Sequence, residues 1–326
     1  MTDTTPDPLQ DRFRGALLGT FVGDALGMPV EGWSADAIES HFGQMRDFQD
    51  ARLGAGTYTD DTQLMIALAE GLLQTSRGEP PNLDEIAERF ARRYDPERGY
   101  GGNARRILQA FQDGELWRDA VESRLLPGGS FANGAAMRVA PVALAYYPDP
   151  KGTESAAAFQ AELTGHTHPE GIFGARLLAR AVLRAIETGT RGESFDGPEF
   201  VHEMVEDAPE PYRQPLVWIA DRLHAEPHEA IRALGVGGRA VQSVPAALWA
   251  FLSSAGDPEE ATIRAVGLGG DTDTIGAMAG ALAFGHHGAS ALPERWWNGL
   301  ETEETHGEPG RDAVVELADR FWKRVG

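Results

Sequence analysis

The apolar residues of the chain recur at the three- and four-residue spacing of amphipathic helices. Between residues 60 and 75, for example, Leu64, Met65, Leu68 and Leu72 share one helical face. The same reasoning predicts helices over residues 11–28, 134–147, 243–253, 275–283 and 312–325, and a short one from Pro293. Convincing apolar–polar alternation, the pattern of a half-buried strand, is lacking. The pattern therefore predicts an all-α fold in one compact domain.

Local signals predict some of the helix boundaries. Asn82 followed by Glu85 has the spacing of a capping box, and Asp257-Pro258 places a cap before a first-turn proline. Pro29 is expected to end the first helix, because the residue before a proline disfavours the helical conformation. Glu31 would then lie on a turn, free to point into a cleft.

Glycines form a stripe along the first predicted helix. Gly15, Gly19, Gly23 and Gly27 recur at four-residue intervals. Each costs a helix up to about 1 kcal/mol relative to alanine, so the stripe needs a compensating contact. A face without side chains lets another backbone approach closely, and we expect a second helix to pack there. The alternative is a weak or broken helix.

The charge balance narrows the class of partner. The 326 residues include 50 acidic and 29 basic ones, for a formal net charge of −21. This argues against a nucleic-acid or anionic-membrane partner, since both need a basic surface. The absence of cysteine excludes disulfides, thiol nucleophiles and cysteine-ligated zinc.

The ends and the hydropathy of the chain lead to further expectations. Residues 1–9 are polar and acidic, and we expect a disordered lead there, followed by a single catalytic domain over residues 10–326. No apolar run approaches the ~20 residues of a membrane span. We therefore expect a soluble, cytoplasmic protein, whose oligomeric state the sequence does not indicate.

Two short segments concentrate carboxylates and threonine hydroxyls where helices begin. They are Thr57–Thr62, with Asp60 and Asp61, and Leu268–Gly276, with Asp271 and Asp273. Asp and Thr are favoured N-caps, so capping is the simpler interpretation of either segment taken alone.

Capping does not account for so many carboxylates. One helix start needs only one cap residue. Asp271 and Asp273 are two residues apart and would not share a face of a formed helix, so they can converge only where the backbone is still turning, which Gly269 and Gly270 permit. Hard divalent cations take oxygen ligands. We therefore predict that the two segments meet and hold a pair of magnesium ions that act on a hydroxyl-rich substrate.

Two glycine-rich loops are candidate substrate-binding segments. Arg98–Asn103 could bind a phosphate through backbone N–H groups, although a plain loop is the favoured interpretation of this segment taken alone. Pro127–Gly134 precedes a helix and suits an anion or a ribose. It lacks the spacing of a nucleophile elbow, so Ser130 is not interpreted as a nucleophile. His166 is expected to contact substrate or to cap a helix.

Taken together, these motifs resemble those of the ADP-ribosylglycohydrolases, which include the arginine-type and serine-type ADP-ribosylhydrolases. The matching segments, in family order, are Gly15–Gly27, Thr59–Thr62, Gly129–Arg138 and Gly269–Thr274. The serine-type relatives commonly have Tyr and Gly where this chain has Phe131 and Ala132, which puts a contact through a phenolic hydroxyl in doubt.

The resemblance implies an all-α fold around a binuclear magnesium site, in which Mn²⁺ could replace Mg²⁺. The implied metal ligands are Thr59, Asp60, Asp61, Asp271, Asp273 and Thr274. Glu31 is the implied catalytic carboxylate, with Asp60 or Asp61 assisting. The implied substrate contacts are Gly99, Gly101, Ser130, Phe131, Asn133 and His166.

The implied reaction is release of ADP-ribose from a protein or small-molecule acceptor. The run Gly129–Arg138 favours serine-linked ADP-ribose, O-acetyl-ADP-ribose or poly(ADP-ribose) over arginine-linked ADP-ribose. Clustered aspartates also suit a two-metal phosphohydrolase. A non-catalytic ADP-ribose binder is the third alternative, because a fold does not fix a function.

Overall fold

Helix α1 (Pro8–Gly27) lies directly against helix α16 (Thr272–His287), backbone to backbone. A Cβ atom on Gly19 or Gly23 would overlap the backbone oxygen of Gly280 or Gly276, respectively. Gly15 and Gly27 meet α16 in the same way near Phe284 and Thr272, so the two helices run antiparallel. The close approach predicted from the glycine stripe is confirmed, and Gly276 and Gly280 supply the matching surface.

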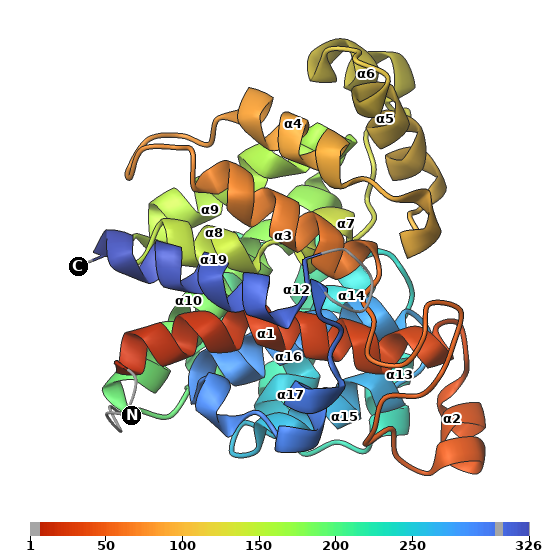
Figure 1. Ribbon diagram of the computed structural model, residues 1–326. Helices are drawn as coiled ribbons and strands as arrows, with labels where there is room; N and C mark the ends of the chain where they lie inside the picture. The colour runs from red at the N-terminus through yellow and green to blue at the C-terminus, as the bar shows by residue number, and fades with distance from the viewer. Residues whose placement is uncertain (1–6, 304–308, 326) are drawn as a thin grey trace.

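The computed structural model describes residues 7–303 and 309–325 (Figure 1). The remaining α-helices are α2 (Ala35–Phe42), α3 (Asp60–Leu72), α4 (Leu83–Arg93), α5 (Gly102–Gln112), α6 (Trp117–Arg124), α7 (Gly134–Met137), α8 (Ala140–Ala145), α9 (Pro150–Ala161), α10 (Pro169–Arg191), α11 (Gly197–Glu206), α12 (Glu210–Asp221), α13 (Pro227–Leu234), α14 (Ala240–Ser253), α15 (Pro258–Gly267), α17 (Glu294–Gly299) and α19 (Arg311–Val325). Short 3-10 turns are η1 (Met28–Val30), η2 (Pro96–Arg98), η3 (Glu162–Thr164) and η4 (Ala289–Ala291).

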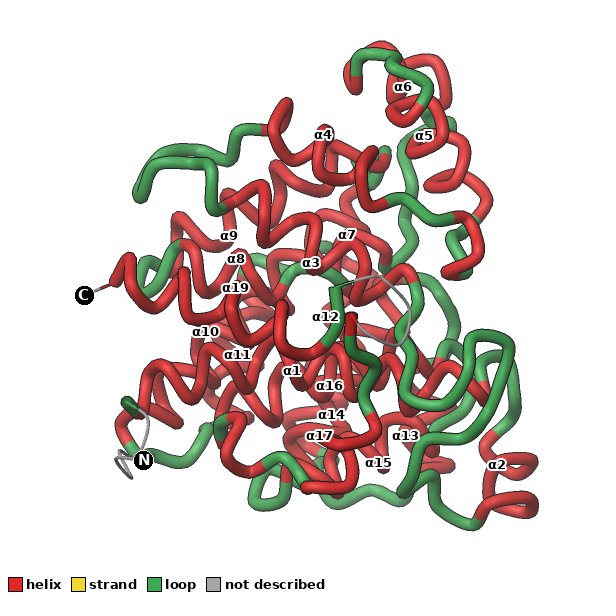
Figure 2. Tube along the Cα trace, in the orientation of Figure 1, coloured by secondary structure: helices red, strands yellow, loops and turns green. Residues whose placement is uncertain are grey.

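Within these described ranges every regular element is helical (Figure 2), and the only β-type pairings are two isolated bridges, Ser34 with Gly269 and Ala132 with Arg239. The predicted all-α class is confirmed. None of the described helices is both long enough and apolar enough to cross a bilayer.

The α1–α16 pair forms the centre of a single domain. Helices α10, α14 and α15 pack on α16, whereas α3, α8 and α19 pack on α1. In Figure 1, α1 crosses the front of the molecule beside α19, and α5 and α6 project at one end. Trp249 and Phe251 of α14 are fully buried, as predicted.

Some predicted boundaries differ from the structure. Helix α1 begins at Pro8, capped by the Asp7 carboxylate, so residues 7–9 are not part of a disordered lead; residues 1–6 lie outside the described ranges. The helix predicted over 134–147 is divided into α7 and α8. Pro141 explains the break, because it has no N–H to donate to the Met137 carbonyl and its ring would clash there.

The capping box predicted at the start of α4 is only half formed. The Asn82 carboxamide oxygen accepts from the backbone N–H groups of Asp84 and Glu85, as a cap should. Glu85 does not return the bond: its carboxylate pairs with Arg89, and the Asn82 N–H donates to Thr75 instead. Helix α3 also ends at Leu72 rather than at Thr75.

The α1–α16 contact predicts that Gly23→Ala is strongly destabilising. The added methyl group would overlap backbone atoms of Gly276 and Ala277, so the helices would have to separate. We expect the free energy of unfolding to fall by at least about 3 kcal/mol, the upper range for overpacking, as measured by urea denaturation. Gly267→Ala is the control, because a Cβ there meets no atom within 4 Å. Equal stability of the two variants would contradict the proposed role of the stripe.

Candidate metal and active site

The first acidic cluster occupies the N-terminus of α3. Thr59 is the N-cap, and Asp60 and Asp61 lie in the first turn, where the helix dipole favours negative charge. The Thr59 hydroxyl lies 3.4 Å from both the backbone nitrogen and the carboxylate of Asp61. Only one of these groups is needed as a cap, so the Asp60 and Asp61 carboxylates remain available for other ligands.

Asp24 of α1 holds this cluster in place, and the sequence analysis missed it. Its fully buried carboxylate accepts from the backbone N–H groups of Thr59 and Thr62, each at 3.0 Å, and from the Thr62 hydroxyl at 2.7 Å. Asp24 therefore caps α3 from a neighbouring helix. The available signal was a lone carboxylate next to the glycine stripe, directly after Gly23.

The second acidic cluster begins where the chain turns into α16. Gly269 and Gly270 adopt positive φ angles of 77° and 76°, as the sequence suggested. The Gly32 N–H donates to the Gly270 carbonyl, and the Gly270 N–H donates to the Trp33 carbonyl, both at 2.8 Å. These reciprocal bonds fix the turn that carries Glu31 onto the start of α16.

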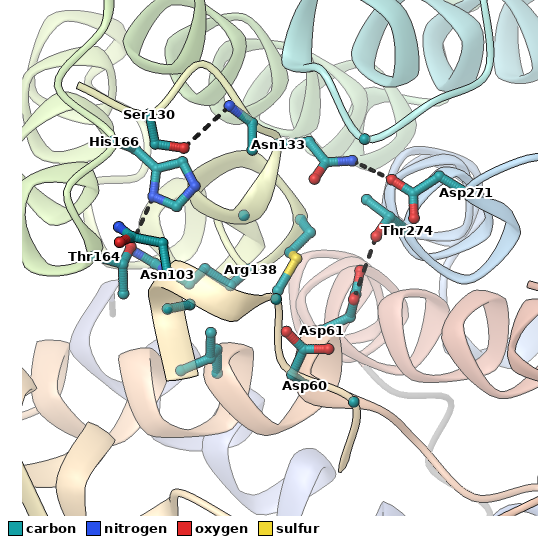
Figure 3. A pocket seen from close by; sticks show the side chains of 18 of the residues that line it. Asp60, Asp61, Asn103, Ser130, Asn133, Arg138, Thr164, His166, Asp271 and Thr274 are labelled. Carbon is teal, nitrogen blue, oxygen red and sulfur yellow. Dashed lines mark hydrogen bonds between the residues drawn. The ribbon is translucent and has the colours of Figure 1, made fainter. Parts of the chain in front are cut away.

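The two clusters meet, as the sequence predicted. The Thr274 hydroxyl lies 3.4 Å from the Asp61 carboxylate, across 213 residues of chain (Figure 3). One carboxylate oxygen each from Glu31, Asp271 and Asp273 lie within 4.8 Å of one another. Glu31 is therefore one of the clustered carboxylates, a position that the sequence analysis did not predict for it.

These carboxylates open into a cleft with a volume of about 410 Å³, within the usual range for a small-molecule site. The cleft is lined by nearly all the predicted site residues: Glu31, Asp60, Asp61, Gly99, Gly101, Ser130, Phe131, Asn133, His166, Asp271, Asp273 and Thr274. The exception is Thr59, which is fully buried and does not line the cleft. Segments from both halves of the chain thus form one site.

The electrostatics of the cluster fit a divalent cation. Burial raises the pKa of Asp60 to about 8, and the Asp24 charge adds to the shift. Burial and the charge of Asp273 raise the pKa of Asp61 well above its usual range. The Asp61 Oδ1 atom is buried without a hydrogen-bond partner. A ligand set made only of oxygen atoms, with mutually repelling charges and an unsatisfied buried acceptor, suits a hard metal ion.

The opposite wall of the cleft is uncharged at the surface. The His166 ring accepts from or donates to the Thr164 hydroxyl at 2.9 Å, and burial lowers the pKa of His166 to about 3, so the imidazole is neutral. The Asn133 amide donates to Asp271 at 2.6 Å and to Ser243 at 2.9 Å. Asn133 thus connects the Ser130 loop to the second acidic cluster, in addition to lining the cleft.

Phe131 forms an aromatic platform at the rim. Its side chain is 47% exposed, and the Arg239 guanidinium lies 5.2 Å from the ring centroid. Arg239 is held in turn by both carboxylate oxygens of Glu170 at 2.8 Å. The ring is therefore fixed in position while remaining open to a ligand.

Arg98 links the first glycine-rich loop (Arg98–Asn103, the glycine loop) to the first acidic cluster. No local sequence pattern had indicated this link. Its buried guanidinium donates to the Tyr58 carbonyl at 2.8 Å and to Glu301 at 3.0 Å. Tyr58 directly precedes Thr59, and Arg98 directly precedes Gly99. A second link lies one turn into α3, where Gln63 accepts from the Tyr100 hydroxyl at 2.5 Å.

An oxygen-only ligand set at two helix N-termini, opening into a cleft of small-molecule size, suits an all-α enzyme that uses a metal ion. The chain belongs to the ADP-ribosylglycohydrolase family, whose model matches residues 5–326. The resemblance drawn from the sequence motifs is thereby confirmed, and the protein is a glycohydrolase enzyme.

Individual relatives agree with this assignment. The chain is 33% identical to the ADP-ribosylhydrolase ARH3 of Homo sapiens, over 90% of each chain. It is 34% identical to an uncharacterized protein of Archaeoglobus fulgidus, over 97% of each chain. A solved structure described as an ADP-ribosylglycohydrolase-related protein complex superposes with a TM-score of 0.75 at 29% identity, covering 98% of this chain and 100% of that one.

The position of Asp24 predicts that Asp24→Asn weakens metal binding. An amide would replace one acceptor oxygen by an N–H₂ group that faces other donors, leaving the start of α3 with one acceptor oxygen instead of two. We expect at least about tenfold weaker Mg²⁺ binding, equivalent to about 1.4 kcal/mol, by isothermal titration calorimetry. Asp11→Asn is the control: Asp11 is buried at the other end of α1, where it accepts from Ser290. Similar loss of Mg²⁺ affinity in both variants would show a general effect of destabilisation.

The raised pKa of Asp60 predicts a pH-dependent stability. Stability from protonated Asp60 is fully present below pH 3.8 and is lost as pH rises to about 8. In EDTA, the unfolding free energy should therefore fall between pH 5 and 8 by more in the wild type than in Asp60→Asn, as measured by urea denaturation. His166 contributes the opposite slope, because its pKa is lowered, but it does so in both proteins. Parallel slopes would contradict the prediction.

Proposed function

We propose that this protein hydrolyses the bond between ADP-ribose and its acceptor in a magnesium-dependent reaction, acting on serine-linked ADP-ribose, O-acetyl-ADP-ribose or poly(ADP-ribose). The observation that carries the proposal is the convergence of Glu31, Asp271 and Asp273 beside Asp61 and Thr274 in one cleft. The similarity to the ADP-ribosylhydrolases named ARH3, at 33% identity in Bos taurus and Homo sapiens, supports hydrolysis of an ADP-ribose bond, whereas the serine-type preference rests on the run Gly129–Arg138.

The metal ligands we propose are those implied by the sequence motifs. They are Thr59, Asp60, Asp61, Asp271, Asp273 and Thr274, with Mg²⁺ as the natural ion and Mn²⁺ as a substitute. When bound, two such ions would supply positive charge that offsets the clustered carboxylates and could bind the ribose hydroxyls. Thr59 is fully buried and does not line the cleft, so an ion that it contacts would lie next to the Asp61 carboxylate, 3.4 Å from the Thr59 hydroxyl.

Glu31 is the proposed proton-transfer group. Cleavage at the anomeric carbon passes through an oxocarbenium-like state: water adds there, and the acceptor oxygen leaves with a proton. Burial and the charge of Asp271 raise the pKa of Glu31, which favours a carboxyl that can carry this proton. Arg52, 3.9 Å away, opposes the shift. Asp60 and Asp61 are proposed to assist.

The diphosphate is proposed to bind chiefly at the first turn of α5. The first backbone bond of that helix runs from Arg105 N–H to the Gly101 carbonyl, so the preceding N–H groups have no intrahelical acceptor. The Ser130–Gly134 loop offers fewer donors than its sequence suggested. Its Ser130 and Asn133 N–H groups already donate to Gly165 and Gly238, respectively.

Other readings remain as alternatives to this proposal. Arginine-linked ADP-ribose would use the same cleft with a different leaving group. A two-metal phosphohydrolase would release AMP or phosphate instead of ADP-ribose, and a non-catalytic binder would release neither. An ADP-ribose-bearing protein or small molecule is the partner we propose, and a cytoplasmic location stays a prediction.

The test is a panel of conjugates assayed with Mg²⁺ and with EDTA. Wild-type protein should release ADP-ribose from serine-linked peptide, O-acetyl-ADP-ribose or poly(ADP-ribose) in Mg²⁺ only, as measured by chromatography. Glu31→Gln should lower turnover by about 10²–10⁴-fold, the usual contribution of general acid–base catalysis. Its dissociation constant for ADP-ribose should stay within about threefold, since the amide keeps the shape of the side chain.

Glu39→Gln provides the matched control, because Glu39 is exposed on α2 and does not line the cleft. It should retain wild-type turnover. Release of AMP or inorganic phosphate would favour the phosphohydrolase, release from arginine conjugates alone would favour the arginine type, and tight ADP-ribose binding without any turnover would favour the binder. Full activity of Glu31→Gln would remove Glu31 from the mechanism.

A further inference from the structure

Arg138 is a buried cation at the wall of the cleft that no step of the proposed reaction uses. It follows α7, has no exposed surface, and lies between His166 and Asp60 in Figure 3. Its guanidinium donates through Nε to the Gln160 side chain at 2.7 Å and through Nη2 to the Gln160 carbonyl at 3.0 Å. The guanidinium also lies 5.0 Å from the centroid of the Phe90 ring.

The positive charge of Arg138 lacks a direct counter-ion. In the part of the chain that the structure describes, no carboxylate pairs with this guanidinium, and its Nη1 atom is buried without a hydrogen-bond partner. Burying an unpaired charge is costly. The same burial lowers the pKa of Arg138 to about 9, which still leaves it largely protonated at neutral pH.

Helix packing does not account for this charge. Gln160 on α9 already donates from its own amide to the Ala135 carbonyl of α7 at 2.8 Å, so these helices are linked without Arg138. A neutral side chain of similar volume would fill the space at lower cost, since uncharged replacements of buried ions are often neutral or stabilising. The charge therefore calls for an electrostatic explanation.

The electrostatic surroundings of Arg138 are uneven across the cleft. On one side lie the carboxylates Glu31, Asp61, Asp271 and Asp273, which repel any anionic part of a ligand. On the other side lies His166, which is neutral because of its burial and, in part, the Arg138 charge. Arg138 thus supplies positive potential at the boundary between the two sides, with Asp60 as the carboxylate that acts on it and the neutral His166 beyond it.

We propose that Arg138 is a specificity-determining residue for the anionic diphosphate of the substrate, which it attracts from within the cleft wall without direct contact. This inference rests on the proposed function, because it takes ADP-ribose as the ligand. A buried charge acts over a longer range than an exposed one, since water and salt screen it less. The positive charge of Arg138 also explains how a cleft rich in carboxylates can bind a dianion.

The test is run at pH 6, where a buried lysine stays protonated more readily than at neutral pH, and compares Arg138→Met, which removes the charge, with Arg138→Lys, which keeps it but loses the guanidinium geometry. Calorimetry at saturating Mg²⁺ should show at least about tenfold weaker ADP-ribose binding for Arg138→Met. A unit charge about 10 Å from one negative charge, at an effective dielectric constant near 20, accounts for about tenfold, and the diphosphate carries two such charges. Arg138→Lys should stay within about threefold of wild type. Mg²⁺ affinity without ADP-ribose should be unchanged or higher in Arg138→Met, because a repelling cation has been removed.

Each other result overturns the inference. Equal ADP-ribose affinity in wild type and Arg138→Met, or equal losses in the Met and Lys variants, would assign Arg138 to packing alone. A parallel loss of Mg²⁺ affinity in Arg138→Met would show a damaged site. Failure of wild-type protein to bind ADP-ribose would instead overturn the proposed function itself.

A second variant covers the case in which Arg138→Met does not fold. Gln160→Glu leaves Arg138 in place and adds a counter-ion at the position where the Gln160 oxygen accepts from Nε. It should weaken ADP-ribose binding as Arg138→Met does, by at least about tenfold. Wild-type affinity in Gln160→Glu would contradict the role of the charge.

Discussion

The direct backbone contact between α1 and α16 is the constraint on which the rest of the structure depends. Glycines on both helices bring the two axes closer than side chains would allow, and the antiparallel direction fixes which ends meet. The end of α1 is thereby placed at the start of α16, so that Asp24 reaches the start of α3 and Glu31 lies beside Asp271. The close packing of α1 on α16, which requires only that the facing residues be small, thus determines where the candidate site lies.

The site assembled in this way is electrostatically costly. Several carboxylates share one wall of the cleft, and burial together with their mutual repulsion raises their pKa values. The protein offsets part of this cost locally, with hydrogen bonds from Thr59 and Thr62 to Asp24 and from Asn133 to Asp271. A divalent cation bound among these carboxylates would recover the remainder, so that affinity for metal and instability without it would have the same origin.

Periodic and repeated features of the fold could be predicted from the sequence, whereas isolated long-range partners could not. The glycine stripe has more glycines than a helix would otherwise carry, and the paired aspartates are more than a helix cap needs. Such an excess points to a contact or a ligand. Asp24 was missed because one carboxylate in a helix resembles any polar position. Arg98 was missed because its partner Glu301 lies 203 residues away and no spacing connects them. The break at Pro141 was missed because the apolar pattern continues through it.

The links from Arg98 and Tyr100 to the start of α3 have a consequence for ligand binding. Since the glycine loop is bonded to Tyr58 and Gln63, it forms one rigid body with the first acidic cluster. The rim on the Glu31 side is held differently, by two backbone bonds to Gly270 and a loose contact with Arg52. Backbone bonds therefore hold the Glu31 turn and side-chain bonds hold the glycine-loop wall, so both walls are preorganised before a ligand arrives.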